Sequence, residues 1–108
     1  MASELLKLQN RTLALQNVHK GISLFKENRN LEAVVYYNKA ISIDELNVDA
    51  YVARGALHAN EGEFHRAIED LEYALTLDVN HSNAKTYLKE VFIANAVKYI
   101  YFFMIFKN

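Results

Sequence analysis

The stretch VDAYVARGALHANE at residues 48–61 decides the fold, because it repeats the stretch ALQNVHKGISLFKE at residues 14–27. A shift of 34 residues superposes identical residue types over both stretches and beyond them: Val18 on Val52, Gly21 on Gly55, Glu27 on Glu61, Ala33 on Ala67, Ala40 on Ala74, Asp44 on Asp78 and Ala50 on Ala84. A fixed period of this length is typical of stacked supersecondary units. The chain is therefore predicted to be a repeat protein.

Two glycines recur in this register, Gly21 and Gly55, and both fall inside apolar-periodic segments. Glycine in the middle of a helix costs roughly 0.5–1 kcal/mol relative to alanine, so its recurrence requires a compensating gain. Close approach of a second helix would supply that gain. We expect small residues on the following helices to face the glycines or to admit the next repeat: Ala33, Ala67, Ala40 and Ala74.

The distribution of helix breakers predicts long helices joined by short turns, since the chain has no proline and only three glycines. Apolar periodicity places helices at residues 4–27, 31–44, 48–60, 64–77 and 82–106. Gly62 lies in one of the turns and suits a left-handed backbone. Asn47 and Ser82 precede or begin helices and are expected to accept hydrogen bonds from free helix amides.

The repeat resembles the tetratricopeptide repeat. The second unit carries the family's residue types at Tyr51, Arg54, Gly55, Ala67, Leu71 and Ala74, and the first at Gly21, Leu24, Ala33, Tyr37 and Ala40. Departures occur at Asn17 and Glu45, at Val79 where proline is common, and at Lys89, which replaces the glycine of a third unit.

The resemblance implies an all-α fold in which antiparallel helical hairpins stack as a short right-handed α-solenoid. About two and a half repeat units would end in a long terminal helix. The expected divisions are an N-terminal helical extension at 1–13, a first repeat at 14–47, a second at 48–81, and an incomplete third repeat with an apolar tail at 82–108.

The same resemblance implies a protein–protein interaction module, an adaptor or scaffold that holds a peptide or protein segment in a concave groove. The first helix of each hairpin lines that groove in the family. By position, the lining would be Val18, His19, Ile22, Phe25, Val52, Ala53, Ala56, Asn60 and Tyr87. An alternative is that the side chains from the first hairpin only pack against the N-terminal extension.

Members of the family that bind chaperones grip a C-terminal carboxylate with lysine, arginine and asparagine side chains. The matching positions of this chain hold Val18, Ile22, Ala53, Asn83 and Tyr87. These side chains cannot supply the charge-assisted hydrogen bonds of such a grip. A mixed or apolar ligand is therefore expected.

Charge and composition argue against several other functions. Twelve lysines and arginines against 13 acidic residues give a net charge of −1, so direct nucleic-acid binding is not expected. The absence of cysteine and of an N-terminal apolar stretch favours a cytoplasmic or nuclear location. No nucleophile motif or phosphate loop is present, and the four histidines show no metal-ligand spacing, so we expect neither an enzyme nor a cofactor or metal.

The last segment changes character, because Tyr99 to Phe106 is an unbroken run of apolar and aromatic residues. A transmembrane helix needs about 20 such residues, so no membrane span is expected. The run could instead make the chain a homo-oligomer, which is a structural alternative to ligand binding. A third alternative rests on residues 52–57 and 67–70, which resemble a family member that carries an RNA-binding domain; the chain would then supply the protein contacts of an RNA-processing protein.

Overall fold

The computed structural model describes residues 2–107 and is all-helical over that range. Its helices are α1 (Ala2–Lys26), α2 (Asn30–Ile43), α3 (Val48–Asn60), α4 (Phe64–Leu77) and α5 (Ser82–Phe106). These bounds agree with the ranges predicted from the sequence to within two residues at each end.

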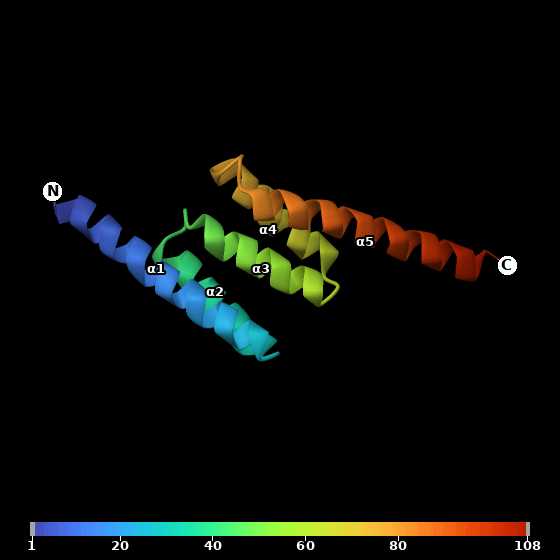
Figure 1. The fold of residues 1–108 in the computed structure, drawn as a ribbon, viewed down its shortest axis with the longest axis horizontal. Coiled ribbons are helices and arrows are strands. Elements are labelled where there is room, and N and C mark those ends of the chain that lie inside the picture. The colour runs from blue at the N-terminus through green and yellow to red at the C-terminus, as the bar shows by residue number, and fades with distance from the viewer. Residues whose placement is uncertain (1, 108) are drawn as a thin grey trace.

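The helices form antiparallel hairpins that stack side by side (Figure 1). Helix α1 packs against α2, α3 against α4, and α5 against α4, while α2 and α1 both contact α3. The result is an elongated molecule of 66 × 29 × 18 Å, in which the start of α1 and the end of α5 lie at opposite ends. The predicted all-α stack of hairpins with a long terminal helix is confirmed.

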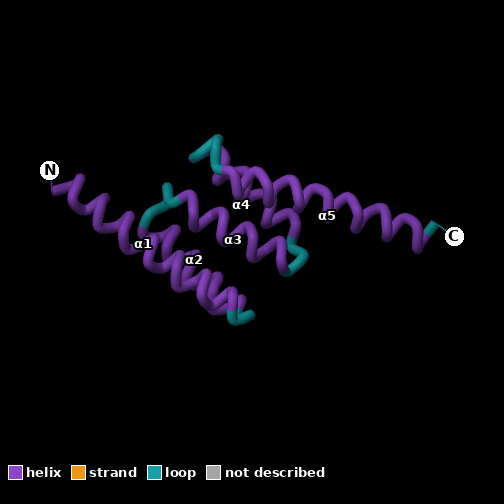
Figure 2. The backbone as a smooth tube through the Cα atoms, viewed as in Figure 1, coloured by secondary structure: helices purple, strands orange, loops and turns teal. Residues whose placement is uncertain are grey.

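Short turns close the two hairpins, as Figure 2 shows. Asn28 and Gly62, which are one repeat apart, both have a positive φ, of 62° and 76°. In each turn an amide of the next residue bonds back to the helix: Arg29 N to Leu24 O and Glu63 N to His58 O, both at 2.9 Å. This left-handed ending satisfies carbonyl groups that a helix otherwise leaves free.

The starts of α3 and α5 are capped by side chains of residues one repeat apart. The side chain of Asn47 accepts a hydrogen bond from Ala50 N at 2.9 Å, as expected for an N-cap. At the start of α5 the cap is His81, whose Nδ1 accepts from Ala84 N at 3.2 Å. The prediction that Ser82 caps this helix is wrong, because Ser82 is already its first helical residue.

The two mid-helix glycines lie where helices cross closely. A Cβ atom at Gly21 would meet the Tyr37 ring, with Cδ1 at 2.7 Å, and one at Gly55 would lie 2.9 Å from Leu71 Cγ. The facing side chains are thus one helical turn beyond the alanines that the sequence suggested. Of those alanines, Ala33 contributes its carbonyl oxygen, 3.1 Å from the Gly21 position. All four expected alanines are completely buried: Ala33, Ala40, Ala67 and Ala74.

Helix α5 runs antiparallel to α4 and continues well past the N-terminal end of α4 (Figure 1). Its last turns carry the run from Tyr99 to Phe106, and every side chain of that run is between 54% and 69% exposed. The segment therefore does not fold back over the repeats. No helix within residues 2–107 combines the length and the apolar character that crossing a membrane requires.

Candidate binding groove

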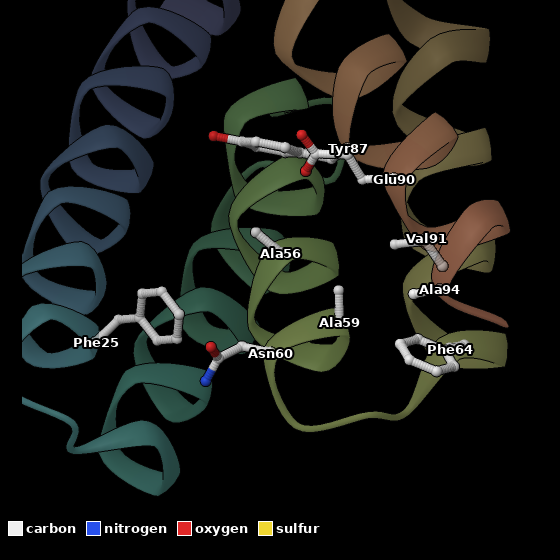
Figure 3. Close-up of a pocket in the computed structure, with 9 residues that line it drawn as sticks. All are labelled: Phe25, Ala56, Ala59, Asn60, Phe64, Tyr87, Glu90, Val91 and Ala94. Carbon is white, nitrogen blue, oxygen red and sulfur yellow. The ribbon is translucent and has the colours of Figure 1, made fainter. Parts of the chain in front are cut away.

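Two neighbouring hollows lie between the first helices of successive hairpins, α1, α3 and α5. One has a volume of about 290 Å³ and the other of about 410 Å³. Both are lined by Phe25, Ala56 and Tyr87, so they form one continuous groove. These three residues come from α1, α3 and α5 in turn, and the close-up of the larger hollow shows them facing the space between the helices (Figure 3).

The nine groove residues named from the sequence all line one hollow or the other. The smaller hollow is lined by Val18, His19, Ile22, Phe25, Val52, Ala53, Ala56 and Tyr87, and the larger by Asn60 together with the three shared residues. Val18 and Val52 are largely buried, at 1% and 7% exposure, so they form part of the floor. His19 and Asn60 are exposed and stand at the rim.

Other lining residues were missed from the sequence, chiefly Phe64, Val91, Ala94 and His81. Phe64 is the first residue of α4, a second helix of its hairpin, so the rule that first helices line the groove does not predict it. Val91 and Ala94 follow Tyr87 at spacings of four and seven residues, which place them on one face of α5. That spacing was readable from the sequence.

The charges at the groove are acidic. Asp49 and Glu90 line it and are both exposed, whereas the lining residues within 2–107 include no lysine or arginine. His81 Nε2 lies 3.5 Å from Asp49 Oδ1 and can pair with that carboxylate when protonated. Lys98 lies outside the lining, with its Nζ 5.8 Å from the centre of the Phe64 ring. The groove is thus an apolar floor with an acidic rim.

Stacked helical hairpins with a groove along their first helices define a helical-repeat protein, a class that works by holding other molecules. A family model of the tetratricopeptide repeat matches residues 17–45 and 48–81. The chain belongs to the tetratricopeptide repeat family.

One relative carries the family's name. The chain is 46% identical over 92 residues to tetratricopeptide repeat protein 14 of Mus musculus, a match that covers 85% of the chain. It is 30% identical to the UDP-N-acetylglucosamine–peptide N-acetylglucosaminyltransferase of Giardia intestinalis and 34% identical to Hsp70-Hsp90 organizing protein 3 of Arabidopsis thaliana, over 74% and 62% of the chain.

The chain spans only a small part of these relatives, namely 12%, 6% and 12% of their lengths in the same order. One of them is an enzyme by name, but repeats of this family are generally not themselves catalytic. They are protein–protein interaction modules, and the chain is a module of this kind.

Proposed function

We propose that the groove between α1, α3 and α5 binds a protein segment with two apolar side chains and a neighbouring lysine or arginine. The observation that carries this proposal is the continuity of the two hollows through Phe25, Ala56 and Tyr87. A ligand with one apolar side chain in each hollow would span all three helices. The Mus musculus relative is consistent with an interaction module, although its name identifies no ligand.

The apolar area that a ligand can bury in the two hollows sets the expected affinity. An aromatic side chain buries about 150–250 Å², which is worth roughly 4–6 kcal/mol at about 25 cal/mol per Å². Loss of translational freedom and ordering of the ligand offset at least 4 kcal/mol of the total. One anchor is therefore too weak, whereas two anchors leave about 4–8 kcal/mol, which corresponds to dissociation constants from roughly millimolar to micromolar.

The acidic rim sets the expected charge of the ligand. A lysine or arginine of the segment would lie near Asp49 or Glu90, and a C-terminal carboxylate would find no cation among the lining residues of the described chain. Hsp70-Hsp90 organizing protein 3 is named for binding chaperones, but we do not extend that ligand class to this chain. The positions of a carboxylate grip hold Val18, Ile22 and Ala53 here.

The test is selection from a displayed library of random peptides, followed by fluorescence titration of the enriched sequences. We expect enrichment of peptides with two large apolar residues and one basic residue, and equal affinity for amidated and free C-termini. Ala56→Arg should abolish binding, because it fills the centre of the groove and repels the basic residue. Val35→Lys is the matched control, since Val35 lies on α2 outside the groove and is 60% exposed.

Two results would overturn the proposal. One is that Ala56→Arg and Val35→Lys bind the selected peptides equally well. The other is that affinity depends on a free C-terminal carboxylate, which would show that a cation outside the described lining provides the grip.

A second candidate function is self-association through the end of α5. Every residue of the run from Tyr99 to Phe106 is more than half exposed, and the Phe102 ring within it stacks on that of Phe106, with ring centres 4.6 Å apart. Exposed apolar surface of this kind is typical of interaction sites. A role as the protein-contact part of an RNA-processing protein stays a prediction.

A further inference from the structure

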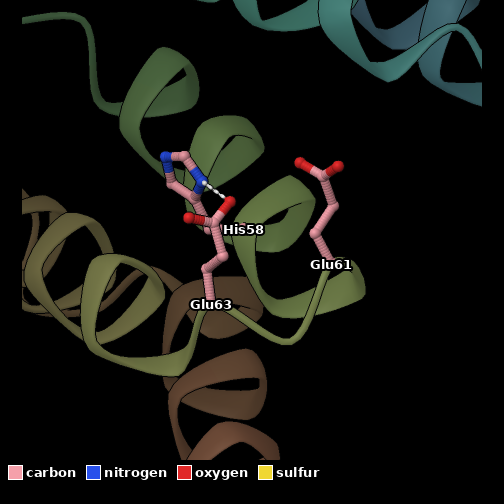
Figure 4. A group of neighbouring side chains, drawn as sticks. All are labelled: His58, Glu61 and Glu63. Carbon is pink, nitrogen blue, oxygen red and sulfur yellow. Dashed lines mark ion pairs between the residues drawn. The ribbon is translucent and has the colours of Figure 1, made fainter.

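Three potential metal ligands gather at the turn between α3 and α4, away from the groove (Figure 4). His58 lies in the last turn of α3, Glu61 follows its end, and Glu63 precedes α4. The left-handed backbone of Gly62, with a φ of 76°, reverses the chain between the two glutamates. One ligand atom from each of the three side chains lies within 4.8 Å of the other two.

One ring nitrogen of His58 has no hydrogen-bond partner within residues 2–107. Its Nδ1 is shielded from solvent and makes no hydrogen bond within the described residues, and the side chain is only 12% exposed. The closest acidic atom is Glu63 Oε1, at 3.8 Å, which is too long for a hydrogen bond. A buried polar atom left unpaired costs about 1–3 kcal/mol, so a ligand that binds this nitrogen would remove that cost.

The other ring nitrogen faces a carboxylate that is itself held in place. His58 Nε2 lies 3.8 Å from Asp70 Oδ2, and Arg54 holds Asp70 through two hydrogen bonds of 2.8 Å. Histidines that bind metals commonly direct their second nitrogen at a carboxylate, which fixes the tautomer and raises the basicity of the ligating nitrogen. At 3.8 Å, Nε2 is not hydrogen-bonded to Asp70, so the ring must move closer to Asp70 for the carboxylate to hold the proton on Nε2 and leave the Nδ1 lone pair facing the glutamates.

From this geometry we propose that His58, Glu61 and Glu63 form a binding site for a divalent transition-metal ion of the zinc type. Nδ1 and one oxygen of each glutamate supply three ligands, and water completes the shell. Zinc–nitrogen and zinc–oxygen bonds of about 2.0–2.2 Å require the ligands to draw closer together. The exposed glutamates are free to do so, although Glu63 must loosen its 3.2 Å ion pair with Arg66.

The choice of ion follows from the donor set. An imidazole nitrogen suits zinc and other first-row transition metals, whereas magnesium and calcium prefer oxygen ligands alone. Two carboxylates also neutralise the double charge of the ion. Sequence spacing did not indicate this site, because the three residues are brought together by a turn and not by one face of a helix.

The test is isothermal titration of the untagged full chain with Zn²⁺, repeated with Mg²⁺. We expect one zinc ion per chain and an affinity for Mg²⁺ that is at least about tenfold weaker. The double variant Glu61→Gln, Glu63→Gln should raise the zinc dissociation constant by about tenfold or more. Both glutamates are exposed, so this variant should keep its fold, and circular dichroism would verify that.

A matched control is the double variant His65→Gln, Glu69→Gln, which removes an exposed histidine and an exposed acid from the adjacent helix. It should bind zinc as the unaltered chain does. Nitrogen-15 NMR supplies a separate readout, because zinc should shift the resonance of His58 Nδ1 more than that of any other histidine nitrogen. The proposal fails if the two double variants bind zinc equally, if the Nδ1 resonance does not move, or if Mg²⁺ binds as tightly as Zn²⁺.

Discussion

Arg54 holds Asp70 in a two-point ion pair across the second hairpin. Arg54 Nε donates to Asp70 Oδ2 and Nη2 to Oδ1, both at 2.8 Å, while Nη1 donates to Asn38 Oδ1 on α2 at 2.9 Å. The hydrogen bond with Asp70 raises the pKa of the Arg54 guanidinium. The side chains are 24% and 10% exposed, so the pair is mostly buried. One arginine thus joins α3 both to its partner helix and to the preceding hairpin.

We predict that Asp70→Ala lowers the free energy of unfolding by about 3 kcal/mol, because it leaves a partly buried guanidinium unpaired. Urea denaturation followed by circular dichroism would measure the change. Arg54→Met with Asp70→Leu should be more stable than Asp70→Ala alone, since apolar residues then replace both charges. A loss under about 0.5 kcal/mol for Asp70→Ala would mean that the pair contributes no more than an exposed one.

The two mid-helix glycines should respond differently to alanine. The Cβ of Gly21→Ala would collide with the ring of Tyr37 and approach Ala33 O, so we expect a loss of about 1–3 kcal/mol. At Gly55 the added Cβ would lie 2.9 Å from Leu71 Cγ and 3.0 Å from Cδ2, which is a less severe approach than that to the Tyr37 ring, and at both positions alanine gains about 1 kcal/mol in helix propensity. Gly55→Ala should therefore cost less than Gly21→Ala in thermal unfolding. Gly55→Leu, which overfills the crossing, should cost about 1–3 kcal/mol.

Substitution of Gly62 tests the turn alone, since no atom of the described residues lies within 4 Å of an added Cβ. Gly62→Ala should destabilise the chain by about 1–2 kcal/mol through its positive φ. Gly62→Asn should cost less, because asparagine tolerates this backbone and already occupies the equivalent position at Asn28. Equal losses for the two variants in urea denaturation would contradict the backbone explanation.

Burial raises the pKa of Tyr37 to about 12 from an ordinary value of 10.0, and its side chain is 1% exposed. As the pH rises from 10 towards 12, the unfolded state loses the phenol proton while the folded state keeps it. Stability should therefore fall in this window, by on the order of 2 kcal/mol for this group. Tyr37→Phe should show a shallower loss between pH 9 and about 11.5 in urea denaturation. Parallel curves for the two proteins would exclude Tyr37 as the cause.

The end of α5 should cause self-association. Removal of residues 92–108 should leave the two hairpins folded and shift the sedimentation profile towards monomer, because it deletes the run that is exposed from Tyr99 to Phe106. Phe102→Lys with Phe106→Lys should have the same effect without shortening the helix. If the full chain sediments as a monomer at high concentration, the oligomer alternative is wrong.

Much of the fold was readable from the 34-residue period. Repetition of glycine, alanine and aspartate placed the hairpins, and the scarcity of helix breakers placed the helix ends. What faces each glycine was not readable, because Tyr37 and Leu71 lie one turn beyond the alanines that recur most clearly. Side-chain direction decides that contact, and periodicity alone does not give it.

The two candidate sites, the groove and the cluster around His58, differ in how well the sequence predicts their residues. The groove lies along the first helix of each hairpin, and helix order can be predicted from the sequence. Groove residues such as Val18, Val52 and Tyr87 were therefore predictable. Phe64 and the turn cluster around His58 depend on where a turn directs its side chains. The role of His81 as the N-cap of α5 was not predicted either, although His81 lies 34 residues after Asn47, the N-cap of α3.

Three alanines, Ala14 on α1, Ala40 on α2 and Ala50 on α3, lie at 0% exposure in the cluster that joins the two hairpins, together with Val18. An alanine has no rotamer to change, so these three positions cannot absorb a larger neighbour by moving their own side chains. Any bulkier residue there must push whole helices apart. Replacement of these alanines by larger residues should therefore change the angle between successive hairpins, and with it the shape of the array.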